Sequence, residues 1–384
     1  MKINTTRIKH ISHTDTDGVT CSILTELIVN SYPGGMFSLD MANINPNMLF
    51  GVIKQTLNEI VNYDLVIVTD LAITPVIAEL IQNSGYADKF RVMDHHETEC
   101  DVSKYKWLNI NKYQVDRSTL TPEEYKSGYY AHPNELLDEE ALIPLTCGTE
   151  LYYNFIKNDR VFDIKMLNLP NTSAIEHLVD TVTSYDTFRF DRHISDDAYM
   201  SIADDDAPRL NTLFYAIPHE EFRQYIDDYI HSRDIDWMQL TVSSKNYPWI
   251  SKVIELENHS NKKYIESALK KLQVFKMHRE IFKYGTIHTF DYKVGFVFAE
   301  KVGPLIGKAV RDNHIDCDLC AVVANNQISL YRINPEVDVS VFARLLNGGG
   351  HKEASGFTIS YEAANEINLM RFNAMIDTAA NIGR

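Results

Sequence analysis

Apolar, β-branched runs alternate with helix-like stretches through the first hundred residues. The apolar runs are residues 7–11, 64–68 and 90–93. Each run leads into a polar or acidic residue, and helical patterning fills the intervals at residues 19–31 and 75–83, where Pro75 suits a first helical turn. This alternation predicts β-α units around a parallel sheet, in which ligands bind beyond the carboxyl ends of the strands.

A second region with its own pattern begins after residue 283. Strand-like runs lie at residues 286–290, 294–299, 319–324 and 327–333. Helical patterns follow at 340–346 and 362–380, with a glycine run at 348–350 between them. Between the two regions, apolar residues recur close to helical spacing through residues 261–283, with lysines on the remaining face. That spacing predicts a connecting helix.

We therefore predict an α/β protein with two domains. A parallel-sheet domain with flanking helices covers residues 1–240, a linker with the connecting helix covers 241–283, and a smaller α/β domain covers 284–384. Residues 112–143 are rich in Tyr, Pro, Glu and Asp and have weak periodicity, so we interpret them as an insertion. The insertion either covers the ligand site or is plain surface.

Composition sets limits on this picture. No apolar run approaches the roughly 20 residues of a membrane span, so we expect a cytoplasmic protein with no membrane partner. The five cysteines lack the spacing of a disulfide framework, and Cys317 and Cys320 are interpreted as structural. A net charge of −16 argues against a protein that grips long duplex DNA. An acidic protein still binds nucleotides where its site holds cations.

Candidate chemistry starts at the end of the first strand-like run, in the segment SHTDTDG. If the strand continues here, alternation places His13, Asp15 and Asp17 on one side. Gly18 would then allow a sharp turn into the following helix. An Asx-rich turn with a helix cap is the alternative for this segment taken alone.

Acidic residues also follow the other strand-like runs. Asp70 ends the second run, the segment Asp94–His96 ends the third, and Asp186 follows a later apolar stretch. A carboxylate at the end of a buried strand is costly unless cations or donors compensate its charge, so the set predicts a shared metal site, although each residue alone is more typical of a cap or turn. Carboxylates with one or two imidazoles suit Mn²⁺ or Mg²⁺ better than Zn²⁺. Two such ions activate water and neutralise phosphate oxygens, which predicts phosphoester hydrolysis with Asp70 as the bridging ligand.

Taken in order, these segments resemble the DHH phosphoesterases that carry a C-terminal DHHA1 domain, and among them the oligoribonucleases of the nanoRNase B type. The resemblance rests on HTDTDG, VTDLAIT, DHH, SYDTFRF, RLNTLFYAIPHEEF and DVSVFARLLNGGGHKEASG, which together span most of the chain. It implies a DHH catalytic domain followed by a DHHA1 substrate-binding domain. It also implies two Mn²⁺ ions, with Mg²⁺ or Co²⁺ as substitutes.

The resemblance further implies roles for single residues. One Mn²⁺ is expected on His13, Asp15 and Asp70. The other is expected on Asp17, Asp70, His95 and Asp186. Two catalytic residues complete the site, Asp94 as an orienting carboxylate and His96 as a phosphate ligand or proton donor near the leaving oxygen.

Substrate contacts are expected from the second domain. Consecutive glycines let backbone N–H groups approach a phosphate, and the residues concerned are Gly348, Gly349, Gly350 and His351. A helix C-cap and loop is the alternative for this segment. A substrate held between it and the metal site would have to be short.

Arg332 departs from the family pattern. It stands three residues after Ser329 rather than two, and strand alternation turns it to the other face unless a bulge intervenes. Arg332 remains a candidate substrate contact, with Tyr331 as the alternative through stacking on a base.

The predicted function is hydrolysis of short oligonucleotides to mononucleotides by water activated at two metals. Expected partners are short single-stranded RNA or DNA oligonucleotides and dinucleotides, and a homodimer is left open. Alternatives with the same chemistry are a RecJ-like single-strand DNA exonuclease, a linear or cyclic dinucleotide phosphodiesterase, and a phosphatase for 3′-phosphoadenosine 5′-phosphate. A non-enzymatic nucleotide sensor is the alternative from another class, and the intact acidic clusters argue against it.

Overall fold

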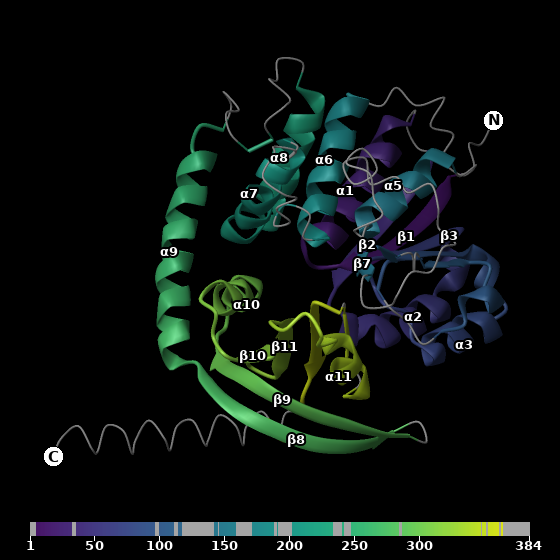
Figure 1. Ribbon diagram of the computed structural model, residues 1–384. Helices are drawn as coiled ribbons and strands as arrows, with labels where there is room; N and C mark the ends of the chain where they lie inside the picture. The colour runs from purple at the N-terminus through teal and green to yellow at the C-terminus, as the bar shows by residue number, and fades with distance from the viewer. Residues whose placement is uncertain are drawn as a thin grey trace. The chain divides into compact units, whose positions relative to one another are not determined.

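The chain forms two compact units, Met1–Asn258 and His259–Arg384 (Figure 1). The computed structural model describes residues 5–32, 36–96, 100–110, 114–116, 142–144, 146–158, 171–187, 190, 202–232, 240–241, 247–283, 286–346, 348–350, 352–360 and 362–363. No helix among these residues is long and apolar enough to cross a membrane.

The first unit is built on a five-stranded sheet of order β2-β1-β3-β4-β5, in which every pairing is parallel. Its strands are β1 Thr6–His13, β2 Phe37–Ile44, β3 Leu65–Thr69, β4 Phe90–Asp94 and β5 Leu108–Ile110. The predicted α/β class and parallel sheet are therefore confirmed. The three predicted strands are the central ones. Strands β3 and β4 are nearly continuous apolar runs, as expected for strands covered on both faces, and β1 buries Ile8 and Ile11 among polar residues. The edge strands β2 and β5 are interrupted by polar residues or very short.

Helices cover both faces of this sheet. The described α-helices that lie wholly within the first unit are α1 Thr16–Ser31, α2 Leu49–Asn58, α3 Pro75–Asn83, α5 Gly148–Asn158, α6 Thr172–Asp186, α7 Ile202–Ala216 and α8 His219–His231. Short 3₁₀ turns lie at Pro46–Met48, Ile60–Asn62, Ala87–Lys89 and Val102–Lys104. Pro75 occupies the first turn of α3, as predicted.

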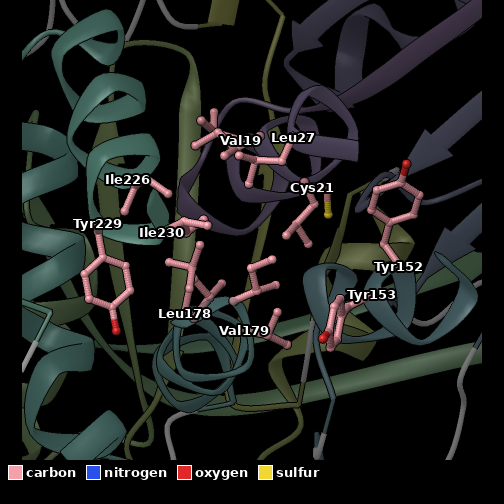
Figure 2. Packing of buried hydrophobic residues seen from close by; sticks show 14 of the residues in the cluster. Val19, Cys21, Leu27, Tyr152, Tyr153, Leu178, Val179, Ile226, Tyr229 and Ile230 are labelled. Carbon is pink, nitrogen blue, oxygen red and sulfur yellow. The ribbon is translucent and has the colours of Figure 1, made fainter. Parts of the chain in front are cut away.

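Two hydrophobic clusters hold the helices to the sheet. One cluster joins Ile8 and Ile67 to α1, α5, α6 and α8, and Figure 2 shows Leu27, Leu178 and Ile226 of three of these helices packed together. The other joins Ile11 to α2 and α3 on the opposite face. With helices packed on both faces of the sheet, the carboxyl ends of the central strands lie together along one edge of it.

The second unit is a six-stranded mixed sheet of order β12-β13-β11-β10-β9-β8. Its strands are β8 Gln273–Lys283, β9 Thr286–Phe298, β10 Leu319–Ala324, β11 Gln327–Arg332, β12 Gly349–Gly350 and β13 Ala354–Thr358. The end of α9 (Ile250–Lys271) and α10 (Gly303–Asp312) pack on one face, and α11 (Val339–Leu345) packs on the other. Cys317 and Cys320 are free thiols buried beside α10, which fits their structural interpretation.

The helix predicted for residues 261–283 is wrong in its second half. Helix α9 ends at Lys271, and β8 begins at Gln273 and pairs antiparallel with β9 along its whole length. Val274, Phe275 and Phe282 favour an extended chain, and pairing with β9 decides between two patterns that single-chain spacing leaves ambiguous. The strands expected at 286–290 and 294–299 are likewise one strand, β9.

Two further predictions lie mostly outside the described residues. Of the insertion at 112–143, only the short antiparallel pair of β6 (Gln114–Asp116) and β7 (Leu142–Pro144) is described. The helix predicted for 362–380 lies beyond the described residues from 364 onward. The functional division at residues 240 and 283 remains a prediction.

Candidate metal centre

The first ligand segment is the turn from β1 into α1. His13 is the last residue of β1, and Asp15 caps α1 by accepting a hydrogen bond from Gly18 N at 3.0 Å. Asp17 already lies in the first helical turn, so strand alternation is wrong as the reason why these side chains converge. A side chain at Gly18 would place its Cβ 2.5 Å from the carbonyl oxygen of His13, which explains the glycine by close packing. The cap turns Asp15 back toward His13, whose Nδ1 lies 2.7 Å from Asp15 Oδ2.

Asp70 directly follows β3, the middle strand of the first sheet. Its φ of 54° is unusual for a residue other than glycine, and its backbone N–H donates to Met93 O at 3.0 Å. The carboxylate is buried and approaches imidazoles from two strands, with Oδ2 3.6 Å from His13 Nδ1 and Oδ1 3.2 Å from His95 Nε2. A buried acidic residue whose backbone is held in an unfavourable conformation is typical of functional sites.

The end of β4 supplies three neighbouring side chains. Asp94 is the last strand residue, and its Oδ1 lies 2.8 Å from His96 Nδ1. His95 turns inward, with Nδ1 3.5 Å from Asp186 Oδ2 at the end of α6 and Nε2 3.7 Å from Asp17 Oδ2. The side chain of His95 is 3% exposed and that of His96 is 24% exposed, so only His96 of this pair reaches solvent.

These segments form overlapping groups whose ligand atoms lie within 4.8 Å of one another. The groups are His13, Asp15 and Asp70; Asp17, His95 and Asp186; and Asp70, Asp94, His95 and His96. The structure thus brings together all eight residues that the sequence predicts for the metal and catalytic roles. Asp70 touches both of the first two groups, because His13 and His95 approach its two different oxygens.

The charges in this site are not balanced by the protein alone. Burial and the charges of Asp17 and Asp15 raise the pKa of Asp70 well above its usual range, and burial raises the pKa of Asp186 to about 7. Burial opposes a charge on His13, yet Asp15 and Asp70 together raise the pKa of His13 to about 10. Without another cation, Asp70 and Asp186 therefore hold their protons more tightly than ordinary carboxyl groups do, and His13 holds its second proton more tightly than an ordinary imidazole does.

A divalent cation fits this arrangement. Three buried carboxylate oxygens accept no hydrogen bond within the described part of the chain: Asp70 Oδ2, Asp94 Oδ2 and Asp186 Oδ2. Buried carboxylate oxygens are normally paired or bound to metal, because desolvation of an unpaired charge is costly. The donor set of carboxylate oxygens and imidazole nitrogens suits Mn²⁺, Mg²⁺ or Co²⁺, so the cluster is able to hold metal.

The start of α5 completes the site, and it was missed in the sequence. Gly148 N and Thr149 N each donate to the Asp17 carboxylate at 2.7 Å, and Thr149 Oγ1 donates to Asp17 O at 2.8 Å. Two helix N-terminal amides therefore fix the orientation of this carboxylate. The available signal was a Gly-Thr pair at the start of an amphipathic stretch, which is too common to mark a site by itself.

Gly148→Ala is expected to damage the site. An added Cβ would lie 2.6 Å from Asp70 Cβ and 3.0 Å from Asp17 Oδ2, so we expect a loss of about 1–3 kcal/mol in unfolding free energy and weaker Mn²⁺ binding. The matched control is Gly51→Ala in α2, where an added Cβ meets nothing within 4 Å; it should leave Mn²⁺ affinity unchanged and stabilise the helix by up to about 1 kcal/mol. Thermal unfolding and Mn²⁺ titration measure both effects, and equal behaviour of the two variants would contradict this account.

A buried polar network beneath the site was also missed. His10 Nε2 lies 2.9 Å from Thr69 Oγ1, and His10 Nδ1 lies 2.8 Å from Thr25 Oγ1, which in turn contacts Tyr152 OH at 2.5 Å. Burial, aided by the charge of Arg223, lowers the pKa of His10 to about 3, so the ring is neutral. Because Thr69 directly precedes Asp70, this network anchors the backbone that presents the central carboxylate.

The candidate substrate residues lie in the second unit. Gly349 and Gly350 form the edge strand β12, and a Cβ at Gly348 or Gly350 would clash with β13, whereas Gly349 faces open space. The glycines are therefore explained in part by close packing on β13. His351 lies outside the described residues.

Arg332 and Tyr331 each have partners within their own unit. The β10–β11 register runs without a bulge, and Arg332 Nη2 pairs with Glu353 Oε1 at 2.5 Å. Tyr331 packs on α10, where a Cβ at Gly307 would lie 2.5 Å from its Cγ. The contact with α10 covers part of the Tyr331 ring, and its stacking on a base remains a prediction.

Comparison with known proteins supports the resemblance seen in the motifs. No family model matches the chain. The chain is similar to oligoribonuclease NrnB of Bacillus subtilis (strain 168), with 24% identity over 354 residues that cover 91% of this chain and 72% of the relative. The resemblance to oligoribonucleases of the nanoRNase B type is confirmed by this match along most of both chains.

Solved structures give weaker likenesses. A pGpG-specific phosphodiesterase, PggH from Vibrio cholerae, is 11% identical and matches 97% of this chain and 99% of its own, with a TM-score of 0.41. Exonuclease RecJ bound to manganese is 13% identical and matches 94% of this chain and 88% of its own, with a TM-score of 0.45. Such scores are too low to establish a shared fold.

Proposed function

We propose that the chain is a metal-dependent phosphodiesterase that hydrolyses short oligonucleotides, RNA fragments above all, to mononucleotides. The observation that carries the proposal is the position of Asp70, whose two carboxylate oxygens reach toward two separate ligand groups. A carboxylate placed in this way is suited to bridge two metal ions. The similarity to an oligoribonuclease along 91% of the chain supports the same activity.

The proposed ligand sets follow the geometric groups. His13, Asp15 and Asp70 would hold one ion, and the second would be held by Asp17, Asp70, His95 and Asp186. Bound there, two Mn²⁺ ions would supply water activation and neutralise phosphate charge. We propose Mn²⁺ as the natural metal, with Mg²⁺ or Co²⁺ as substitutes.

The chain's own residues would orient the substrate and move a proton. Asp94 is buried and holds Nδ1 of His96, so Nε2 is the ring nitrogen that would meet a phosphate oxygen or protonate the leaving oxygen. The greater exposure of His96 than of His95 supports this division, with His95 as a ligand and His96 as a substrate contact. The α5 amides would keep the Asp17 carboxylate in place.

The proposed substrates are short single strands. A net charge of −16 makes long duplexes poor partners, because their binding depends on basic surface, whereas metal ions suffice for a few phosphates. In the second unit we propose the glycine segment as a phosphate contact through Gly349, which faces open space; Arg332, already paired with Glu353, is the weaker candidate. Degradation of RNA fragments also makes the cytoplasm the proposed location.

Chelator-treated protein tests the proposal. Adding Mn²⁺ should restore the hydrolysis of end-labelled RNA oligomers, from dimers up to pentamers, and the products should be mononucleotides. An RNA of about 20 nucleotides should be cut far more slowly. A cyclic dinucleotide and 3′-phosphoadenosine 5′-phosphate, tried in parallel, distinguish the alternative substrates. Absence of cleavage of every short RNA, DNA and dinucleotide under these conditions would rule out the enzyme.

A further inference from the structure

Strand β8 is a long sheet edge. It forms the last strand of the second sheet, its eleven residues all pair with β9, and no other described residue pairs with it. Its apolar side chains are unusually accessible, with Val274 45% exposed and Phe282 72% exposed. A long edge strand with exposed apolar side chains is a template for pairing with another chain.

The β8–β9 hairpin also runs on past the rest of its sheet, as the two long green strands in Figure 1 show. Strand β10 pairs with β9 only at Val294–Phe298, so among the described residues no third strand lies beside the β9 residues before Val294 and their β8 partners. A two-stranded ribbon is marginally stable in water. Phe290 packs on Phe342 of α11, but the cross-strand pair Phe282 and Ile287 near the turn remains 72% and 61% exposed.

The sequence of β8 is complementary to itself. When two copies run antiparallel about a two-fold axis at His278, Lys276 faces Glu280 of the other copy, and Val274 faces Phe282. Each contact occurs twice, because the axis repeats it. Within its own hairpin, Lys276 lies opposite Lys293 and Glu280 lies opposite Thr289, so neither finds an opposite charge there.

Other symmetric registers are poorer. A two-fold axis at Lys276, Arg279 or Glu280 places identical charges directly opposite each other. An axis at Met277 sets Val274 against Glu280 and leaves the lysine without an acidic partner. The register centred on His278 is also the one that pairs all eleven residues of the strand.

We propose that β8 is a homodimer interface, in which β8 of one copy pairs antiparallel with β8 of a second copy about an axis at His278. The pairing joins two six-stranded sheets edge to edge. An antiparallel pair of this length gives about ten backbone hydrogen bonds, comparable to the number in an ordinary protein interface. It also covers Val274 and Phe282 and pairs Lys276 with Glu280.

Charge reversal tests both the partner and the register. Lys276→Glu and Glu280→Lys each create two like-charge pairs across the axis, so each should weaken dimerisation about tenfold or more in sedimentation equilibrium. The double variant K276E/E280K restores the opposite charges and should dimerise like the wild type. At concentrations low enough for the wild type to be monomeric, all three variants should unfold at the wild-type temperature, which separates weaker pairing from a damaged fold.

Cross-linking adds a second test in the full-length protein. His278→Cys places two thiols across the axis, so mild oxidation should give a covalent dimer, whereas Glu280→Cys faces Lys276 and should not cross-link. The five natural cysteines are buried and should not interfere. The proposal is overturned if the wild type stays monomeric at high micromolar concentration. Hydrogen exchange adds to this result, because β8 amides that are protected in a monomer would show that another part of the same chain covers the strand. The proposal is equally overturned by a dimer that neither charge reversal nor the position of the cysteine affects.

Discussion

Asp70→Asn should reduce hydrolysis by about a thousandfold or more, because the change removes the one carboxylate placed to serve both ligand groups. Asparagine has nearly the same shape and tolerates the left-handed backbone at this position, where φ is 54°. The fold should therefore survive. Without metal, the variant should melt at the same temperature as the wild type or higher, since it no longer buries a carboxylate with one oxygen that accepts no hydrogen bond.

Asp64→Asn is the matched control. Asp64 immediately precedes the same strand at its other end, where it is half exposed and pairs with Arg7 at 3.1 Å. Surface pairs of this kind contribute little, so activity and Mn²⁺ affinity should be unchanged. Mn²⁺ titration, steady-state hydrolysis and thermal unfolding of both variants separate a lost ligand from a damaged fold. An Asp70→Asn variant with wild-type turnover would remove Asp70 from the mechanism.

Metal removal should make the stability of the protein depend strongly on pH. In the metal-free fold the pKa of Asp186 is about 7 instead of 3.8, so its contribution to stability is complete below about pH 4 and is lost as the pH rises through 7. The pKa of His13 is raised from 6.5 to about 10, so its contribution is present below about pH 6.5 and is lost toward pH 10. Both groups therefore destabilise the metal-free protein as the pH increases.

Mn²⁺ should reverse this trend, because it binds the deprotonated ligands. Its affinity should increase roughly tenfold per pH unit for each proton released, and saturating Mn²⁺ should add about 4 kcal/mol per ion at a thousand times its Kd. Thermal unfolding with chelator and with Mn²⁺ between pH 5 and 8, a range chosen to bracket the pKa near 7, gives the two curves. The curves should diverge as the pH rises. Parallel curves would show that these groups do not bind the metal.

Much of the site was predictable because its residues stand at the ends of central strands. Strands β3 and β4 are clear apolar runs, and β1 carries the buried Ile8 and Ile11, so the acidic residues at or after the ends of these strands are conspicuous. Parallel pairing then brings those ends to one edge. Asp186 was recognisable as an acidic residue after a later apolar stretch, but its place beside His95 was not. No spacing rule links the end of this helix to the DHH motif 90 residues earlier, so its ligand role came from the family resemblance.

The remainder depended on contacts that a single sequence does not contain. The donors to Asp17 come from Gly148 and Thr149, more than a hundred residues away, and backbone amides leave no mark on residue type. The reason for convergence at Asp15 and Asp17 was also wrong, because the helix begins at Thr16 and not at residue 19, so the chain is helical where alternation requires a strand. Residues 273–283 have apolar positions close to helical spacing, yet they form strand β8. Pairing with β9 stabilises the extended conformation, and this long-range contact cannot be read from local spacing.

Electron paramagnetic resonance during Mn²⁺ titration of the metal-free protein tests the central claim most directly. If Asp70 bridges two ions, the wild type should bind two equivalents and develop the spectrum of an exchange-coupled Mn²⁺ pair, and RNA dimer hydrolysis should rise with that signal. Asp70→Asn should lose the coupled signal. Binding of a single uncoupled Mn²⁺ at full activity, or a coupled pair that persists in Asp70→Asn, would contradict the account.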